Sequence, residues 1–410
     1  MTKVSIAAVI PTRNRAEMAI TAVRYLRRQP NCDLWIFVSD NSAREEDVRR
    51  LADFCGALDD PRVTYMRTPG DWPQGMHWDW AARQALERSD ATHVTVHYDR
   101  KIMRPGAAAD WFALAGRFPD KLFTYASDFV SAEPPPRRLW QQPWTGKVYL
   151  LKTARAIEVS ARGQAFEVGQ MLPILSNSIV PRAVVETLVD RFGTFCDSTT
   201  ADSCFAYRFC ALHDDYLHLD RPLTILYGSE RSAAVGYLSG GGGDFADYRQ
   251  TWRGESWLDA GVIPGLNLGY NMLFHEYELV RRKLGGDRLP PLDRQGCLRD
   301  LARGLGWVRD AKSRSELRGC LTEHGWDGEG EVSAPAPSPS RWRRAGSAVR
   351  QRAALLLADR LHIAPRTITG FQFATDEEAL RYAVKYPSRP TRNEAHLAIV
   401  EPMEIEACTS

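Results

Sequence analysis

The stretch Val4-Ser5-Ile6-Ala7-Ala8-Val9-Ile10-Pro11-Thr12-Arg13-Asn14-Arg15 opens the chain with an apolar run that ends in polar residues. A nearly continuous apolar run of this length is expected of a parallel strand covered on both faces. Two more such runs end in the same way: residues 34–39 precede Asp40-Asn41-Ser42, and residues 92–97 precede Tyr98-Asp99-Arg100. In an open parallel sheet, ligands bind outside the carboxyl ends of the strands. The three polar strand ends therefore predict one nucleotide-sized site.

Segments with helical spacing of apolar residues separate these strands. Residues 16–29, 45–58 and 75–88 are predicted helices, and residues 63–67 are a further short strand. Strands that alternate with helices indicate right-handed βαβ units and a parallel sheet. The predicted fold class is α/β, with a Rossmann-like, mostly parallel sheet that is flanked by helices.

The second half of the chain has a looser pattern. Predicted helices span 107–118, 181–192, 201–212, 266–284 and 293–312, and predicted strands span 122–126, 147–151, 216–219 and 223–226. We expect four regions: a main domain over 1–235, a helical appendage over 236–330, a Pro/Ala/Ser-rich linker over 331–340, and a basic amphipathic helix with a tail over 341–410.

Composition excludes several classes of protein. The 53 basic and 51 acidic residues nearly cancel, so no nucleic-acid partner is expected. The eight cysteines form no C-x-x-C pair, which favours reduced thiols over a zinc site or a disulfide scaffold. The start of the chain lacks the pattern of a signal peptide, and no apolar run approaches the ~20 residues of a spanning helix. We expect a cytoplasmic protein.

The basic helix predicted over 341–363 leaves two interpretations open. Its arginines and apolar residues suit peripheral contact with an anionic membrane, here the inner face of the cell membrane. The same helix could instead pack on the main domain and turn a solvated basic face outward.

The turn after the first strand has the wrong chemistry for a dinucleotide site, because no G-x-G-x-x-G motif follows it. Thr12, Arg13, Asn14 and Arg15 instead offer hydroxyl, amide and guanidinium donors. At the next strand end, Asp40 suits a ribose hydroxyl or a base N–H. An aspartate there can also be a turn or helix-capping residue.

Several ordered segments resemble the family 2 glycosyltransferases of the GT-A fold, over about residues 4–235. The segments are the opening strand and turn through Arg15, Val38-Ser39-Asp40-Asn41-Ser42, Gly75-Met76-His77-Trp78-Asp79-Trp80-Ala81, Val94-Thr95-Val96-His97-Tyr98-Asp99, and Thr200-Ala201-Asp202-Ser203-Cys204. The resemblance implies a nucleotide-sugar donor held by Pro11, Thr12, Arg13, Asn14, Arg15, Asp40, Asn41, Trp78, Tyr98, Asp99 and Arg100. It also implies that Asp202 faces the acceptor. An inverting transfer needs a carboxylate to take the proton of the attacking hydroxyl, so Asp202 is the candidate general base. Alternatively, Asp202 caps its helix.

One departure from the family concerns the metal. Members usually carry two or more aspartates at the D-x-D site, whereas this chain has Tyr98-Asp99-Arg100-Lys101. A single carboxylate can hold a hydrated Mg²⁺ or Mn²⁺ only weakly, and we expect Asp99 to contact such a metal. Alternatively, Arg100 or Lys101 supplies the positive charge beside the departing diphosphate.

The resemblance therefore implies a hexosyltransferase-like enzyme of class EC 2.4, with a saccharide, lipid-linked glycan or small metabolite as acceptor and a setting in polysaccharide biosynthesis. Two alternatives remain. A nucleotidyltransferase would need a Gly-rich, Lys-containing phosphate loop, but residues 11–15 contain no glycine. A catalytically degenerate protein that binds a nucleotide-sugar is compatible with the thinned aspartate site.

Overall fold

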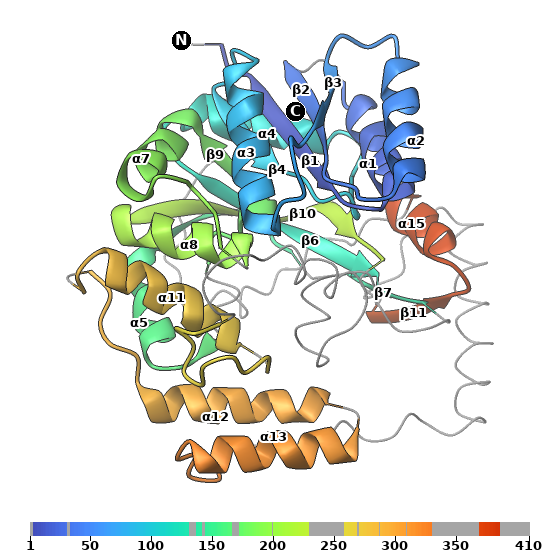
Figure 1. Cartoon of the computed structure of the whole chain (residues 1–410). Helices are drawn as coiled ribbons and strands as arrows, with labels where there is room; N and C mark the ends of the chain where they lie inside the picture. The colour runs from blue at the N-terminus through green and yellow to red at the C-terminus, as the bar shows by residue number, and fades with distance from the viewer. Residues whose placement is uncertain are drawn as a thin grey trace.

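The computed structural model describes residues 3–30, 33–130, 137–141, 144–165, 172–198, 200–228, 258–268, 270–286, 288–308, 310–329 and 369–385. The linker expected over 331–340 and the basic helix expected over 341–363 lie outside the described residues, and both stay predictions. Figure 1 shows the arrangement of the helices and strands around a central sheet.

The first half of the chain forms the predicted parallel sheet. Its strands are β1 (Ile6–Thr12), β2 (Leu34–Asp40), β3 (Val63–Arg67) and β4 (His93–Val96), in the order β3-β2-β1-β4. They alternate with α1 (Ala16–Arg27), α2 (Glu45–Gly56) and α3 (Gln74–Glu87). The α/β class and the Rossmann-like arrangement are confirmed. Because Thr12 pairs with Asp40 in register, the ends of β1 and β2 lie side by side.

The second half extends this sheet with mixed pairing. From β4 the order runs through β9 (Ser178–Pro181), β6 (Phe123–Val130), β7 (Arg137–Trp140) and β11 (Thr369–Phe373), and each of these pairs is antiparallel. The long strand β10 (Asp215–Leu226) lies parallel to β6 and antiparallel to β5 (Lys101–Met103) and β8 (Val148–Lys152).

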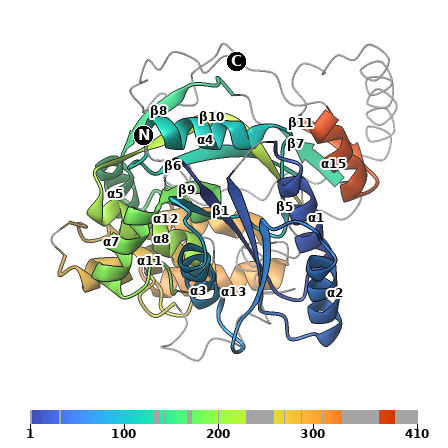
Figure 2. The same ribbon diagram turned by 90° about the horizontal axis from the view of Figure 1, so that it is seen from above.

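Alternation along β1 divides the core between the two faces of the sheet. Ala7 and Val9 face a cluster shared with α3 and α8 (Ala201–Leu212), whereas Ile6, Ala8 and Ile10 face one shared with α1 and α4 (Ala107–Arg117). Figure 2 shows these two layers on opposite sides of the strands. Since the helices cover both faces, the strands can be apolar throughout.

Two boundaries in the second half were predicted wrongly. The segment Asp220-Arg221-Pro222 was expected to separate two strands, but β10 runs through it with register shifts between Leu219 and Pro222 and between Pro222 and Thr224. A proline is tolerated at such an irregularity because its missing N–H is not needed in the ladder there. The helix expected over 293–312 is two helices, α12 (Arg294–Gly304) and α13 (Ala311–Glu323). The second begins afresh because Asp310 caps it, accepting a 2.7 Å hydrogen bond from the Ser313 N–H.

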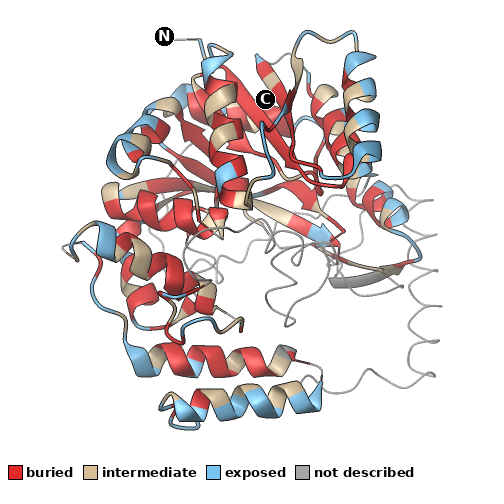
Figure 3. Cartoon of the chain, viewed as in Figure 1, coloured by how far each residue is buried: buried red, intermediate tan, exposed pale blue. Residues whose placement is uncertain are grey.

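The C-terminal helices share the core of the sheet. Helix α11 (Asn271–Lys283) packs against α8, and its Leu273, Phe274 and Tyr277 belong to the same buried cluster as Val9. Figure 3 shows that α8 is buried along nearly its whole length. Helix α12 approaches the end of α5 (Thr153–Ala161) so closely that a Cβ on Gly163 would lie 2.1 Å from the Cys297 nitrogen.

The last described segment returns to the sheet. Strand β11 pairs with β7, and α15 (Asp376–Lys385) lies beside it near α1 (Figure 1). Leu380 and Ala383 of α15 join a small apolar cluster with Ile102, Ile225 and Tyr227. No helix within the described ranges is long and apolar enough to cross a membrane.

Candidate active site

The turn after β1 is fixed by hydrogen bonds to the turn after β2. Asn14 adopts a left-handed backbone conformation, with φ of 54°. Its Oδ1 accepts hydrogen bonds from the N–H groups of Ala43 (2.9 Å) and Arg44 (3.0 Å), and its own N–H donates to the Ser42 hydroxyl (2.8 Å). Asn14 therefore joins two strand ends.

Asp40 is fully buried and is satisfied within the protein. Its Oδ1 accepts a hydrogen bond from the Ser42 N–H (2.8 Å), its Oδ2 accepts one from the Tyr65 hydroxyl (2.9 Å), and Arg67 lies 3.3 Å from Oδ2. The bond to the residue two positions on is an Asx turn. Of the two interpretations of Asp40, the structure shows the turn residue, and a role toward a nucleoside stays a prediction.

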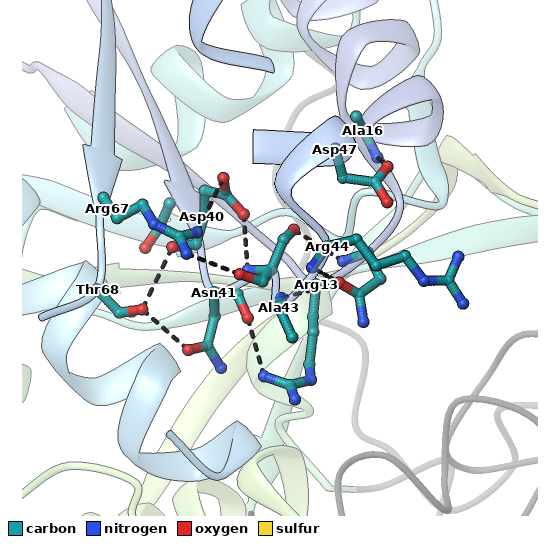
Figure 4. Close-up of polar contacts among 12 residues, drawn as sticks. Arg13, Ala16, Asp40, Asn41, Ala43, Arg44, Asp47, Arg67 and Thr68 are labelled. Atoms are coloured by element: carbon teal, nitrogen blue, oxygen red, sulfur yellow. Dashed lines mark hydrogen bonds and ion pairs between the residues drawn. The ribbon is translucent and has the colours of Figure 1, made fainter. Parts of the chain in front are cut away.

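Asn41 ties the end of β2 to the segment before α3. Its Nδ2 donates to the Trp72 carbonyl (2.7 Å), and its Oδ1 accepts from the Thr68 hydroxyl (2.9 Å) and the Trp72 N–H (3.2 Å). Arg13 donates to the Asn41 carbonyl (2.9 Å) and is ion-paired with Asp71. Figure 4 shows Arg13, Asn41 and Thr68 converging at this edge. Thr68, Asp71 and Trp72 were not predicted, because they follow a short, half-buried strand whose end carries no distinctive polar run.

Asp99 lies directly behind the first turn. Its Oδ2 accepts a 2.8 Å hydrogen bond from the Thr12 hydroxyl and lies 2.8 Å from Nε of Arg15, and the side chain is only 1% exposed. The end of β4 is therefore joined to the end of β1, as the sequence predicted.

A divalent cation fits this environment poorly. Asp99 contributes one carboxylate, which is already ion-paired with Arg15. In the part of the chain that the structure describes, no three His, Cys, Asp or Glu side chains gather closely enough to hold a metal ion. A hard cation wants several oxygen ligands. The metal contact expected at Asp99 stays a prediction.

Tyr98 connects this edge to the candidate base. Its hydroxyl donates a hydrogen bond to Oδ2 of Asp202, the second residue of α8. The Ser176 N–H donates a 2.9 Å bond to Oδ1, so both carboxylate oxygens are held. The Tyr98 ring packs at 5.3 Å, centroid to centroid, on Trp78 of α3. Trp78 is buried, so its contribution to the site is to pack against the Tyr98 ring.

Burial sets the protonation of this pair. It raises the pKa of Asp202 above its ordinary value, although the bonds from Tyr98 and Ser176 act in the opposite direction. Burial and the neighbouring Asp202 raise the pKa of Tyr98 well above its ordinary value, so the phenol keeps its proton and acts as the donor. A carboxylate with a raised pKa is a stronger base.

Arg100 and Lys101 both lie close to the Tyr98 ring. Arg100 donates to the Tyr227 carbonyl (3.2 Å), and its guanidinium carbon is 5.6 Å from the ring centroid. Lys101 is 1% exposed, and its Nζ lies 5.1 Å from that centroid and donates to the Ser176 carbonyl. Burial lowers the pKa of Lys101 to about 7, and the charge of Arg100 acts in the same direction.

The structure thus brings the predicted residues into one neighbourhood. Thr12 touches Asp99 and pairs with Asp40, and Tyr98 touches Asp202. The sequence suggested the polar run Ser176-Asn177-Ser178 only as a neighbour of the site that could reach acceptor hydroxyls. In the structure the Ser176 N–H and carbonyl instead hold Asp202 and Lys101.

The fold and this cluster define an α/β protein with a buried polar site at the carboxyl ends of β1, β2 and β4. No family model and no curated protein matches the sequence. Among solved structures, S. aureus TarS is similar at 12% identity with a TM-score of 0.41, covering 78% of this chain and 52% of TarS. TarS 1-349 in complex with UDP-GlcNAc is similar at 12% identity with a TM-score of 0.42, covering 78% of this chain and 89% of that one.

A third similar structure is the mannosyltransferase PcManGT from Pyrobaculum calidifontis in complex with GDP-Man and Mn²⁺. Its identity is 12% and its TM-score 0.40, covering 78% of this chain and 79% of that one. All three TM-scores lie below 0.5.

Proposed function

We propose that the chain is an inverting glycosyltransferase, which moves a sugar from a nucleotide-sugar donor to a hydroxyl acceptor with Asp202 as general base. The hydrogen bond from Tyr98 to Asp202 is the observation that carries this proposal. It joins the strand end expected to face the donor to the helix expected to face the acceptor. A base must lie within hydrogen-bond reach of the proton that it takes, and this bond supports a position of Asp202 beside the expected donor residues.

The donor would lie along the ends of β1, β2 and β4. Arg13, Arg15 and Arg100 each have side chains that are less than a tenth exposed, and together they bring three guanidinium groups to this edge. Guanidinium groups suit phosphate oxygens because they donate in a fixed fork. Charge that develops on the departing diphosphate would be stabilised by these groups. Pro11, Asn14, Asp40 and Asn41 would shape the nucleoside side of the cleft.

The acceptor hydroxyl would approach Asp202 from the side of α8. Since both carboxylate oxygens are held, by Tyr98 and by the Ser176 N–H, the remaining lone pairs have a fixed direction. Proton transfer to Asp202 would accompany attack of the acceptor oxygen on the anomeric carbon. A saccharide, a lipid-linked glycan or a small metabolite would serve as acceptor, in an EC 2.4 reaction of cell-envelope polysaccharide synthesis.

A nucleotide-sugar panel tests the donor class. TarS 1-349 is in complex with UDP or UDP-GlcNAc and PcManGT with GDP-Man, so UDP-, GDP- and dTDP-sugars form the panel, each with and without Mn²⁺. We expect one nucleotide class to raise the Tm by several degrees and its sugar to be released slowly as product. No stabilisation and no turnover by any donor would contradict the proposal.

Two separate measurements test the metal contact of Asp99 and the membrane contact of residues 341–363. Loss of activity in EDTA that Mn²⁺ restores would support a cation at Asp99, and unchanged activity would contradict it. Flotation with anionic liposomes, comparing the full chain with one that ends at residue 339, tests the membrane contact proposed for 341–363. Equal flotation of both chains would contradict that contact.

One observation favours a second candidate, a protein that binds a nucleotide-sugar without turning it over. Both carboxylate oxygens of Asp40, the amide oxygen of Asn41 and Oδ2 of Asp99 already have partners inside the protein. Stabilisation by a donor with no release of its sugar, with or without acceptors, would support this candidate over the enzyme.

A further inference from the structure

Glu276 of α11 places a buried carboxylate at the start of α8. The side chain is 1% exposed, and its Oε1 accepts three hydrogen bonds. The donors are the hydroxyl of Ser198 (2.6 Å), the hydroxyl of Thr200 (2.7 Å) and the N–H of Thr200 (3.2 Å). Three donors on one oxygen fix the backbone that enters the helix.

This contact replaces an ordinary helix cap. Thr200 is the N-cap residue of α8, yet its side chain makes no capping bond to its own helix. Its hydroxyl donates to Glu276 instead. A side-chain oxygen that accepts hydrogen bonds near a helix N-terminus is favourable because the backbone N–H groups there have no partner within the helix. The carboxyl of Glu276, from a helix 70 residues further on, takes that place.

The same backbone is held from its other side by α3. A Cβ on Gly75 would lie 2.2 Å from the Ser198 carbonyl oxygen, so the two segments touch at a point where only glycine fits. The segment before α8 therefore contacts two helices. It packs against Gly75 of α3, the helix that carries Trp78, and it is hydrogen-bonded to Glu276 of α11. Asp202 lies two residues after Thr200.

We propose that Glu276 is a positioning residue for Asp202, holding the first turn of α8 so that the carboxylate of Asp202 stays between Tyr98 and Ser176. This inference rests on the proposed function in that Asp202 is the base. It gives α11 a role in the reaction through the backbone that leads into α8.

The protonation state of Glu276 changes the strength of this hold. The ionisable groups around it are Cys204 and Arg208 of α8, and Arg208 is ion-paired with Asp197 of the preceding loop. Burial raises the pKa of Glu276 from 4.5 to about 7, against the hydrogen bonds and Arg208, which lower it. The buried contact therefore favours the neutral acid, and the hold weakens when Glu276 ionises above about pH 7.

Two substitutions separate position from charge. Glu276→Ala removes the acceptor of all three bonds, and kcat should fall about tenfold or more at every pH with the donor Kd unchanged. Glu276→Gln keeps the acceptor oxygen and matches the neutral acid. The ratio of kcat for Glu276→Gln to kcat for the wild type should be near one at pH 6 and rise steadily to pH 8.5. Titration of Asp202 cancels in this ratio.

Glu278→Gln is the matched control. It lies on the same helix and pairs with Arg281 and Arg282 at the surface, so its ratio to wild type should stay flat with pH. A flat ratio for Glu276→Gln as well, or full kcat in Glu276→Ala, would overturn the inference.

Amide hydrogen exchange of the first turn of α8 gives a readout that needs no substrate. We expect Glu276→Ala to lose protection there at pH 6 and pH 8, and Glu276→Gln to be better protected than wild type at pH 8 only. Equal protection in wild type and Glu276→Ala would overturn the positioning role. If amide exchange changes as expected but no nucleotide-sugar is turned over, the result supports Glu276 as a residue that positions the first turn of α8. The same result contradicts the proposed enzymatic activity.

Discussion

The hydroxyl of Tyr98 donates a hydrogen bond to the carboxylate of Asp202, 104 residues further along the chain. Tyr98 directly precedes Asp99, the single aspartate of the segment Tyr98-Asp99-Arg100-Lys101. While the phenol donates its proton to Asp202, it holds one oxygen of that carboxylate in place. The bond therefore links the segment around Asp99 to the orientation of the candidate base.

Removing this hydroxyl should slow the transfer without weakening donor binding. Tyr98→Phe keeps the ring against Trp78 and deletes one bond to a charged acceptor, so kcat should fall about tenfold to a hundredfold with little change in the KM of the donor. The bond from Tyr98 lowers the pKa of Asp202, so its loss should move the acidic limb of the pH–rate profile to higher pH. Tyr207→Phe, on the same helix but bonded to Ser160, is the control and should leave that limb in place.

Neutralising the base should stop the chemistry. Asp202→Asn should lower kcat by about 10²–10⁴-fold, the usual contribution of a general base, while the nucleotide Kd measured by calorimetry stays unchanged. Asp190→Asn, on the exposed side of α7 (Arg182–Phe192), should behave as wild type. Turnover by Asp202→Asn at the wild-type rate would exclude Asp202 as the base.

The ion pair between Asp99 and Arg15 should contribute strongly to the free energy of unfolding. Both side chains are buried, so Asp99→Asn removes the carboxylate that is ion-paired with Arg15 and should cost about 3–5 kcal/mol of unfolding free energy in urea. Adding Arg15→Met to that variant should recover part of the loss. A double variant that is less stable than the sum of the two single changes would argue against the pair as the cause.

Glu276 should make the stability of the whole chain depend on pH. Its pKa is raised from 4.5 to about 7, so between these pH values the folded state keeps a proton that the unfolded state has lost. The free energy of unfolding should therefore fall as pH rises from about 4.5 to about 7, by about 3 kcal/mol from this group, and then level off. Urea unfolding of wild type and Glu276→Gln at pH 5, 6, 7 and 8 measures the difference. A difference that does not vary with pH would contradict this assignment.

The last described helix should contribute measurably to folding. Leu380 of α15 is buried in the apolar cluster with Ile225 and Tyr227, and Leu380→Ala should cost about 2–5 kcal/mol in the same urea assay. Glu377→Ala, which removes an exposed pair with Arg381, should change stability by less than about 1 kcal/mol. Equal effects of the two substitutions would indicate that α15 does not pack as described.

Strands β1, β2 and β4 were predictable because they are mostly apolar and are buried on both faces. Residues 63–67 were predicted with the same bounds as β3, and 201–212 with the same bounds as α8. Strands β7, β9 and β11 were missed, since each is four or five residues long and draws its stability from a neighbour distant in sequence. The spacing of apolar residues within a short segment does not reveal which distant strand it pairs with.

The site divides in the same way. Thr12, Asp40 and Asp99 could be brought together from the rule that parallel strands end at one edge of the sheet. The bond from Tyr98 to Asp202 could not, because it depends on how α8 packs across the second half of the molecule. The contacts of Asp40 with Tyr65 and Arg67 could not be predicted either. Both partners lie on β3, a short, half-buried strand whose sequence does not mark them as site residues.

The pairing of β11 with β7 has a consequence for biosynthesis. Strand β7 is made early, yet the strand that covers its outer edge is translated more than two hundred residues later. Until then a nascent chain carries an open backbone edge beside exposed Ile102 and Ile225, a combination that invites pairing with other chains. Ribosome-bound chains that stop short of residue 369 should therefore be the species most in need of a chaperone.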